Sequence, residues 1–393
     1  MEPFDIARGW AVWMLAIGQT LGYACLYYIF AALILSWQAD LGWDKASLAL
    51  GPTLAIVISA VAAPFAGRMV DRGWGPAMLA GGAALGALAL VWLSRVGSLQ
   101  GYLIGWAVIG VAQAACLYEV CFAFLIRRLG PVARVAIIRV TLVAGFASTL
   151  AFPAGAWLAE GWGWRGAVMV AAGAMALIGP LNWLAAGMIR RQGLPPVTPD
   201  HAADRDGLRL ALRRRAFWLL ASCFALVSLN HWMIVNFLVP IFVEQGASPA
   251  RAVLAASLVG PSQVAGRLVL MRYETRIGTG TATLLTVGVS VLATLALGLS
   301  GLAPGLIFVF ALAQGAALGV LTILRPVMIA EALGQAGYGA IAGVIQIPAL
   351  LAGAVAPVLG ALVLSGPGLW ALLVLSLALS LAAFGAIRAM GRL

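Results

Sequence analysis

Charged side chains are scarce in this chain of 393 residues, of which 9% are Asp, Glu, Lys or Arg. A soluble globular domain carries about 25% charged residues, so this scarcity excludes the ordinary soluble class. Hydrophobic residues make up 63% of the sequence, and the mean hydropathy is +1.03. The composition therefore predicts an all-α integral membrane protein that lies in a lipid bilayer.

Cysteine and chemically recognisable motifs are rare as well. The four cysteines fall inside apolar segments, which indicates small core residues and supports neither a disulfide framework nor a metal site: Cys25, Cys116, Cys121 and Cys223. A phosphate-binding Gly-x-x-x-x-Gly-Lys loop, a metal-spaced His/Cys set and a nucleophile elbow are all missing from the sequence. We therefore expect no metal, no cofactor and no enzymatic activity, and a membrane enzyme or receptor is the least favoured alternative.

Long apolar windows predict twelve transmembrane helices in two sets of six. The first set covers residues 10–36, 47–70, 76–95, 101–126, 136–158 and 166–189, and the second covers 216–241, 250–272, 279–300, 304–330, 339–364 and 368–388. The first run is too long for a signal-peptide core, so we expect an uncleaved helix. The polar, proline-containing stretch between the sets predicts a cytoplasmic linker. The predicted domains are thus a six-helix bundle at 1–189, the linker at 190–215, and a second bundle at 216–393.

Basic residues are distributed unevenly over the predicted loops. If the N-terminus lies inside, eighteen of the 24 basic residues fall on the cytoplasmic side, four fall outside and two lie within spans. This bias predicts a multi-pass protein of the cytoplasmic (inner) membrane with both termini in the cytoplasm. It also accounts for the net charge of +11, so we expect no nucleic-acid partner.

Two arginines, Arg267 and Arg325, lie inside apolar runs that contain no acidic side chain at helical spacing. A charge at the bilayer centre costs roughly 2.5–3.5 kcal/mol on insertion scales, so such residues face a protein interior or an aqueous cavity. A guanidinium stays charged and pairs bidentately with a carboxylate, so we hypothesise that an anionic substrate supplies the missing charge. Alternatively, Arg325 snorkels to the cytoplasmic face or binds carbonyls freed beside Pro326.

A short loop motif supports a family resemblance. The loop after the second predicted span contains Gly67, Asp71 and Arg72 in the order G-x-x-x-D-R. Asp71-Arg72 aligns with Thr275-Arg276, which lies at the same point of the second six-helix set. With the six-plus-six spans and the basic linker, the chain resembles the major facilitator superfamily over essentially its whole length. The loop is similar to that family's signature G-x-x-x-D-R-x-G-[RK]. Gly163-Trp164-Arg165, before the sixth span, is also similar to the family.

The resemblance implies a major facilitator fold of two six-helix bundles and secondary transport by alternating access. It also implies that Gly67, Asp71 and Arg72 form a conformational latch at a cytoplasmic helix end. The residues agree, because an aspartate near a helix N-terminus is favoured electrostatically and an arginine can clamp helix ends. The alternative is an ordinary capped turn.

Two further patterns bear on the branch of the family. Arg8-Gly9-Trp10-x-x-Trp13 and Gln263-x-x-x-Arg267 resemble the monocarboxylate and oxalate exchanger branch. Gln263 stands where that branch has an acidic residue. The branch also has an intramembrane lysine, which has no counterpart here, since Lys45 lies in a predicted outer loop. Drug–proton antiporters typically have an arginine in helix four and a Gly-x-x-x-Gly-Pro pattern in helix five. In this chain Trp106 occupies the helix-four position, and the run 145–155 lacks the helix-five pattern.

The first, fourth, seventh and tenth helices line the central cavity in this superfamily. Polar residues in these helices, and a pair in helix eight, recur at helical spacing. The resemblance therefore implies a substrate site formed by Gln19, Tyr23, Tyr27, Asn230, Asn236, Gln263, Arg267, Gln314 and Arg325.

Glu119 and His231 are the candidates for proton coupling, because they are the acidic residue and the histidine that lie well inside predicted spans. A buried carboxylate or imidazole can exchange a proton near neutral pH. Alternatively, Glu119 pairs with Arg139 or another basic group, and His231 bonds to its neighbours.

The sequence thus predicts a monomeric secondary transporter for a small organic anion, working by proton coupling or by exchange. An efflux antiporter for lipophilic or cationic compounds is the second alternative. Two buried arginines disfavour it, because like charges repel strongly at low dielectric.

Overall fold

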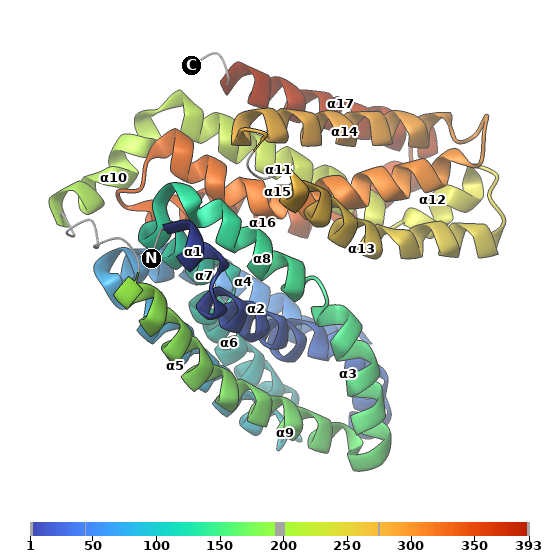
Figure 1. The fold of residues 1–393 in the computed structure, drawn as a ribbon. Coiled ribbons are helices and arrows are strands. Elements are labelled where there is room, and N and C mark those ends of the chain that lie inside the picture. The colour runs from blue at the N-terminus through green and yellow to red at the C-terminus, as the bar shows by residue number, and fades with distance from the viewer. Residues whose placement is uncertain (1–2, 44, 193–200, 274–275, 391–393) are drawn as a thin grey trace. The chain divides into compact units, whose positions relative to one another are not determined.

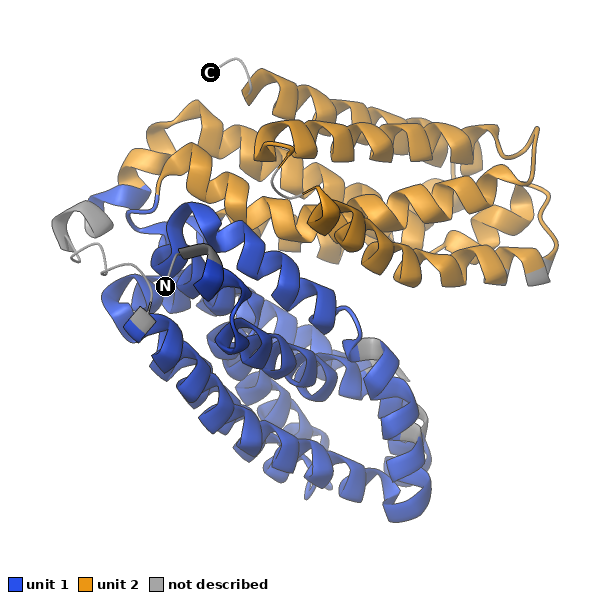
Figure 2. Cartoon of the chain, in the orientation of Figure 1, with its two compact units in different colours: residues 1–208, 335–344 blue, residues 209–334, 345–393 orange. Residues whose placement is uncertain are grey.

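The structure is a computed structural model that describes residues 3–43, 45–192, 201–273 and 276–390. All regular elements in these ranges are helical, which confirms the all-α prediction (Figure 1). The chain divides into two compact units, residues 1–208 with 335–344 and residues 209–334 with 345–393 (Figure 2). The predicted domain boundaries stay a prediction; in the predicted linker, residues 193–200 lie outside the described part.

Unit 1 contains the first half of the predicted spans. Its elements are α1 (Pro3–Arg8), α2 (Trp10–Tyr23), the π-helix η1 (Ala24–Tyr28), α3 (Ile29–Leu41), α4 (Lys45–Met69), the π-helix η2 (Val70–Trp74), α5 (Gly75–Leu93), α6 (Leu99–Cys116), α7 (Tyr118–Leu129), the 3₁₀ turn η3 (Gly130–Val132), α8 (Ala133–Ala144) and α9 (Ala147–Gln192). Helix α10 (His201–Arg213), within the predicted linker, follows these elements, and the boundary between the units falls inside it.

Unit 2 contains most of the second half. Its elements are α11 (Arg215–Val235), α12 (Leu238–Glu244), α13 (Pro249–Arg272), α14 (Thr279–Leu299), α15 (Leu306–Leu333), most of α16 (Tyr338–Ser365) and α17 (Leu369–Met390). The first residues of α16, up to Val344, belong to unit 1. Helices α14 and α17 run side by side, as do α13 and α15 (Figure 1).

Within the described ranges, nine helical stretches are long and apolar enough to cross a membrane, and a bent pair, Trp10–Tyr28 with Ala32–Leu41, makes a tenth. Two of them, of 47 and 57 residues, each cover two predicted spans. Such lengths correspond to about 70–85 Å of helix, more than twice the hydrocarbon core of ~30 Å. Counting each of these two stretches as two crossings gives the predicted twelve.

Glycine provides two of the breaks between successive predicted spans. Gly73, after α4, has φ 88°, and Gly163, inside α9, has φ 68°. Residues with a Cβ rarely adopt such angles, whereas glycine does so at little cost. Both glycines therefore allow the chain to turn between spans that are otherwise continuous in hydrophobicity.

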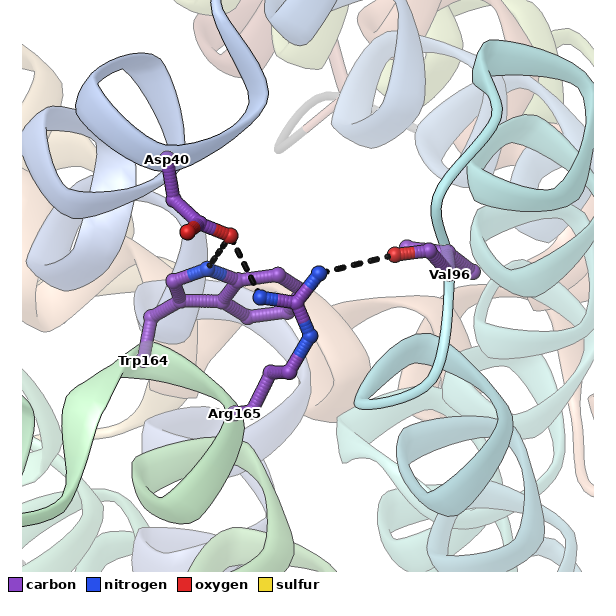
Figure 3. Close-up of polar contacts among 4 residues, drawn as sticks. All are labelled: Asp40, Val96, Trp164 and Arg165. Carbon is purple, nitrogen blue, oxygen red and sulfur yellow. Dashed lines mark hydrogen bonds and ion pairs between the residues drawn. The ribbon is translucent and has the colours of Figure 1, made fainter.

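A polar cluster fastens three segments of unit 1 next to the break at Gly163 (Figure 3). Asp40, near the end of α3, accepts hydrogen bonds from Trp164 Nε1 at 2.8 Å and from the guanidinium of Arg165. Arg165 also donates to the carbonyl of Val96, between α5 and α6, at 3.3 Å. Its guanidinium lies 4.3 Å from the centre of the Trp164 ring, so charge and aromatic packing act together.

In unit 2, a glycine pair brings α15 against α13. Gly315 and Gly319 are spaced i, i+4, the small-xxx-small pattern that lets membrane helices approach closely. A Cβ on Gly315 would meet the backbone of Val259, and one on Gly319 would meet the backbone of Gln263. The backbone of α13 thus lies directly on α15, and this contact positions Arg267.

Candidate functional site

The predicted helix-one residues lie at a break in the helix. Gln19 is buried and donates from Nε2 to the carbonyl of Cys116 at 2.8 Å, while Gln113 donates to the carbonyl of Leu26 at 2.7 Å. Leu26 lies in the π-helix η1, and Cys116 ends α6 before the extended residue Leu117. Both glutamines therefore bind carbonyls at helix irregularities, where regular helical bonding is disturbed.

Gln19 also carries a hydrogen-bond acceptor that this structural role does not use. Its Oε1 is buried and has no hydrogen-bond partner among the described residues. A buried polar atom without a partner costs free energy, so such positions are candidates for ligand contact. The predicted part of Gln19 in substrate binding stays a prediction.

A tyrosine cluster lies where η1 meets the start of α7. The rings of Tyr23 and Tyr118 are 4.5 Å apart, those of Tyr23 and Tyr27 are 6.1 Å apart, and those of Tyr27 and Tyr28 are 5.2 Å apart. Glu119 is exposed beside them and interacts electrostatically with the Tyr23 hydroxyl. The helical spacing of Tyr23 and Tyr27 indicated their shared face, whereas the meeting with Tyr118 depends on the fold.

Asp71 is 4% exposed and caps a helix far away in the sequence. Its two carboxylate oxygens accept the backbone N–H groups of Gly339, at 3.0 Å, and Ala340, at 3.2 Å. These are among the first residues of α16, whose N–H groups have no partner inside the helix. A carboxylate at this end is favoured by the hydrogen bonds and by the helix dipole.

Gly67 explains how the carboxylate reaches this helix. A Cβ on Gly67 would collide with the backbone of Gly339, and a Cβ on Gly339 would collide with the backbone of Gly67. Because both residues are glycine, the two backbones touch directly. The spacing of Gly67 and Asp71, one helical turn apart, then directs the carboxylate to the first N–H groups of α16.

The arginine beside Asp71 in space is not its sequence neighbour. Arg127, in the last turn of α7, places Nη1 3.6 Å from Asp71 Oδ1. Arg72 is exposed and forms no hydrogen bond or ion pair with the described residues. The predicted latch role of Gly67, Asp71 and Arg72 stays a prediction, as does the alignment with Thr275, which lies outside the described residues.

Arg267 is 5% exposed and lies in the α13–α15 contact. Its Nε donates to the carbonyl of Gly319 at 3.3 Å, and the same carbonyl accepts the Thr322 hydroxyl at 2.7 Å. This bond engages one of the five N–H donors of the guanidinium. Gln263, one turn earlier, is half-buried at the same contact.

Arg325 lies on α15, half-buried, with its guanidinium carbon 5.0 Å from the ring centre of Phe224 on α11. A ring at this distance attracts the guanidinium charge through a cation–π interaction. Gln314, three turns earlier on the same helix, is buried, and its Oε1 has no hydrogen-bond partner in the described part of the chain.

The predicted helix-seven residues have different surroundings. Asn230 is engaged by α17: Ser376 donates to its Oδ1 at 2.5 Å, and its Nδ2 donates to Ser380 at 3.0 Å. His231 is buried against Trp232, and its Nδ1 lacks a hydrogen-bond partner within the described ranges. Asn236 is exposed and donates to the carbonyl of Trp232 at 2.5 Å. Of the three, His231 is the one with a buried polar atom that lacks a hydrogen-bond partner among the described residues.

Comparison with known proteins identifies the family. The sequence profile described as Major Facilitator Superfamily matches residues 15–357. The chain belongs to the major facilitator superfamily. It is a multi-pass membrane transporter, and its bent and long helices are the spans of that fold. A comparison with curated proteins gives no match.

Solved structures agree on the fold at low sequence identity. A major facilitator transporter, FucP, in an outward conformation, has a TM-score of 0.74 at 14% identity over 99% of this chain and 99% of that one. A variant of FucP, the E. coli fucose:proton symporter, has a TM-score of 0.71 at 14% identity, over 96% and 97%. The proton:xylose symporter XylE, bound to a bromo-deoxyglucose, has a TM-score of 0.70 at 13% identity, over 97% and 95%.

Proposed function

We propose that this major facilitator transporter carries a small organic anion, carboxylate-like in chemistry, by alternating access with proton coupling or exchange. The observation that carries the proposal is Arg325, half-buried on α15 with its guanidinium over Phe224. A neighbouring aromatic ring restrains the guanidinium, and a restrained guanidinium is suited to bidentate pairing with a carboxylate. A permanent charge inside a membrane helix marks a substrate or ion path by default.

Arg267 supports the same substrate class from α13. Its Nε bond to Gly319 orients the guanidinium at the α13–α15 contact, where Gln263 also lies. A positioned guanidinium loses less conformational entropy when an anion binds than a mobile one does. The resemblance of Gln263-x-x-x-Arg267 to the monocarboxylate and oxalate exchangers points in the same direction, and assignment to that branch is part of the proposal.

Proton coupling is proposed through Glu119 and His231. Glu119 is the acidic side chain next to the tyrosine cluster, and His231 keeps a buried ring nitrogen with no described hydrogen-bond partner. Carboxylate and imidazole groups can exchange protons near neutral pH. FucP and XylE are described as proton symporters, which favours proton coupling over exchange.

The proposed latch is Asp71 at the N-terminus of α16, with Gly67 allowing the approach and Arg127 in place of Arg72 as the paired arginine. Breaking two hydrogen bonds and one ion pair is a change small enough for a conformational switch. We also propose that the protein works as a monomer in the inner membrane with both termini in the cytoplasm.

A lipophilic cation is the second candidate substrate, and the tyrosine cluster favours it. Aromatic faces attract cations, and Glu119 adds a negative charge beside Tyr23. The two candidates differ in sign of charge, so one binding screen separates them.

The screen measures the unfolding temperature of the purified protein with small carboxylates, other oxyanions, neutral sugars and cationic drugs. A ligand that binds the folded state raises this temperature, by an amount that grows with the ratio of ligand concentration to Kd. We expect carboxylates to raise it. Stabilisation by cations alone would reverse the assignment, and stabilisation by sugars alone would align the chain with the substrates named for FucP and XylE.

The substrate found in this way is then tested against Arg325→Gln and Arg267→Gln. Loss of a charge-assisted hydrogen bond of about 1.5–3 kcal/mol weakens binding roughly 10- to 150-fold. Arg251→Gln is the matched control, because Arg251 is an exposed arginine of unit 2 in the first turn of α13. Unchanged uptake of the radiolabelled substrate by both variants would refute the anion site.

A further inference from the structure

A surface that is both basic and apolar lies in unit 2, where α10 ends and α11 begins. The exposed face of α10 carries Arg209 and Arg213, one helical turn apart, with Leu210 between them. Arg215, the first residue of α11, and Trp218, in its first turn, are exposed as well. None of these five residues belongs to the predicted transport site, and together they are called the α10 surface.

Two hydrogen bonds fasten the junction between α10 and α11. Trp218 donates from Nε1 to the carbonyl of Leu212 at 2.9 Å, and Arg214 donates from Nη1 to the carbonyl of Ala332, near the end of α15, at 3.4 Å. The side chain of Trp218 is nevertheless 57% exposed, and that of Leu210 is 56% exposed. The α10 surface is therefore held in place by the fold while its apolar side chains still face outward.

The positive charge of the α10 surface is not neutralised by nearby groups of the chain. Arg209, Arg213 and Arg215 form no hydrogen bond or ion pair with the described residues. The sequence has no acidic residue in the stretch 207–243. Asp206, one turn before Arg209, is exposed and has no ion pair in the described part of the chain. The excess charge favours an anionic partner from outside the protein.

The length of α11 indicates where this surface lies in the bilayer. Helix α11 contains 21 residues, Arg215–Val235, and is apolar enough to cross a membrane. A helix of this length extends about 32 Å, close to the ~30 Å of the hydrocarbon core. Arg215, at its start, therefore lies at the level of the lipid headgroups. Trp218 lies within one turn of it, at the depth where aromatic side chains are enriched.

We propose that the α10 surface binds the headgroups of anionic phospholipids. Arg209, Arg213 and Arg215 bind the phosphates, because a guanidinium pairs bidentately with phosphate and clustered basic residues beside a span attract anionic lipids. Leu210 and Trp218 contact the boundary between headgroups and acyl chains, as the apolar side chains of interfacial helices do. A soluble anion provides no such apolar boundary, so the exposed leucine and tryptophan favour a lipid.

The test uses the full-length protein, purified and stripped of lipid in detergent. Native mass spectrometry measures its apparent affinity for phosphatidylglycerol and for phosphatidylcholine with the same acyl chains, and inorganic phosphate is then added as a competitor. The double variant Arg209→Gln/Arg213→Gln removes two charges from the α10 surface, and Arg209→Lys/Arg213→Lys retains them. The matched control is Arg272→Gln/Arg388→Gln, which removes two exposed arginines from the last turns of α13 and α17.

We expect the parent to bind phosphatidylglycerol more tightly than phosphatidylcholine. The glutamine pair should bind phosphatidylglycerol roughly 10- to 30-fold more weakly, because each basic residue near an anionic surface strengthens binding about fivefold. The lysine pair should lie between the two, since lysine keeps the charge and loses the planar fork. Equal affinities of the parent for the two lipids, or an equal loss in the Arg272/Arg388 control, would overturn the proposal. Displacement of phosphatidylglycerol by inorganic phosphate would overturn it in favour of a soluble anion.

Discussion

A single buried carboxylate, Asp71, fixes the first turn of α16 within unit 1. It provides two acceptors to adjacent backbone N–H groups, and these bonds need a precise approach that Gly67 and Gly339 allow. Hydrogen bonds to a charged group contribute more than neutral ones, and a buried donor left unpaired costs about 1–3 kcal/mol. Most of the strength of this contact therefore depends on the charge of one side chain.

Asp71→Asn is expected to lower the unfolding temperature and to change transport. The asparagine keeps one acceptor oxygen but turns an NH₂ group toward a backbone N–H, so at least one buried donor loses its partner, at a cost of about 1–3 kcal/mol. Asp206→Asn is the matched control, because Asp206 is an exposed aspartate on α10. Thermal unfolding of both variants checks the prediction; an equal loss in the two would contradict it.

Individual site residues were only partly predictable from the sequence. The motif identified Asp71, but its partners Gly339 and Ala340 are 268 and 269 residues away, and no local signal indicates them. The neighbouring Arg72 was the arginine expected to act, whereas Arg127 is the one that lies beside the carboxylate. Side-chain partners of this kind are set by packing between distant helices, which a single sequence does not reveal.

Several membrane helices are irregular, and polar side chains compensate for the irregularities. The first span passes from α2 through the π-helix η1 to α3, and the fourth breaks at Leu117 between α6 and α7. Gln19 and Gln113 bind carbonyls at these two places. In lipid an unsatisfied backbone carbonyl is costly, so a helix irregularity inside the bilayer needs such a donor.

Gln113→Leu is expected to destabilise unit 1. Leucine is apolar and leaves the carbonyl of Leu26 without its donor, which costs about 1–3 kcal/mol. The variant should therefore unfold at a lower temperature than the parent. Full stability of Gln113→Leu in a thermal unfolding experiment would show that the bond is dispensable.

The α13–α15 contact gives a second prediction at the scale of elements. Gly319→Ala places a methyl group against the backbone of Gln263, so the helices must separate. Overpacking of this kind costs about 1–3 kcal/mol, and it also displaces the carbonyl that binds Arg267. Gly385→Ala on α17 is the matched control, since its Cβ would meet open space. Thermal unfolding separates the two: Gly319→Ala should be less stable than the parent, and Gly385→Ala should not.

The positions of the helices were largely predictable, and their irregularities were not. Hydrophobic windows locate spans because the bilayer imposes the same requirement on every crossing. The window 304–330, for example, corresponds to α15 at Leu306–Leu333. The break at Leu117 and the separate helix α12 follow from local backbone geometry inside apolar sequence, where hydropathy does not change.

At the scale of the whole molecule, a basic-residue bias fixes the expected orientation in the membrane. All four cysteines are buried, so a cysteine introduced at an exposed position can be labelled over a low background. Trp162→Cys, 65% exposed before the break in α9, should react with a membrane-impermeant maleimide on intact cells. Arg191→Cys should react only after the membrane is opened. The reverse pattern would contradict the predicted orientation.

The fold class and family could be predicted from the sequence because composition, span number and one loop motif all agree. The substrate could not. Arg267 and Arg325 are equally unusual in the sequence, yet one is bound to a backbone carbonyl and the other lies over an aromatic ring. Which of them meets a ligand depends on that packing.

The contact at Asp71 also has a genetic consequence. Its partners at α16 are backbone amides, which every residue except proline retains. Substitutions at Ala340 other than proline therefore retain the donor, while added bulk at Gly339 or Gly67 displaces the backbone that carries it. Loss-of-function changes should then gather at Asp71 and at the two glycines. Mutations that compensate for loss of the Asp71 carboxylate should arise outside these positions of α16, because the groups of α16 that Asp71 binds are backbone amides.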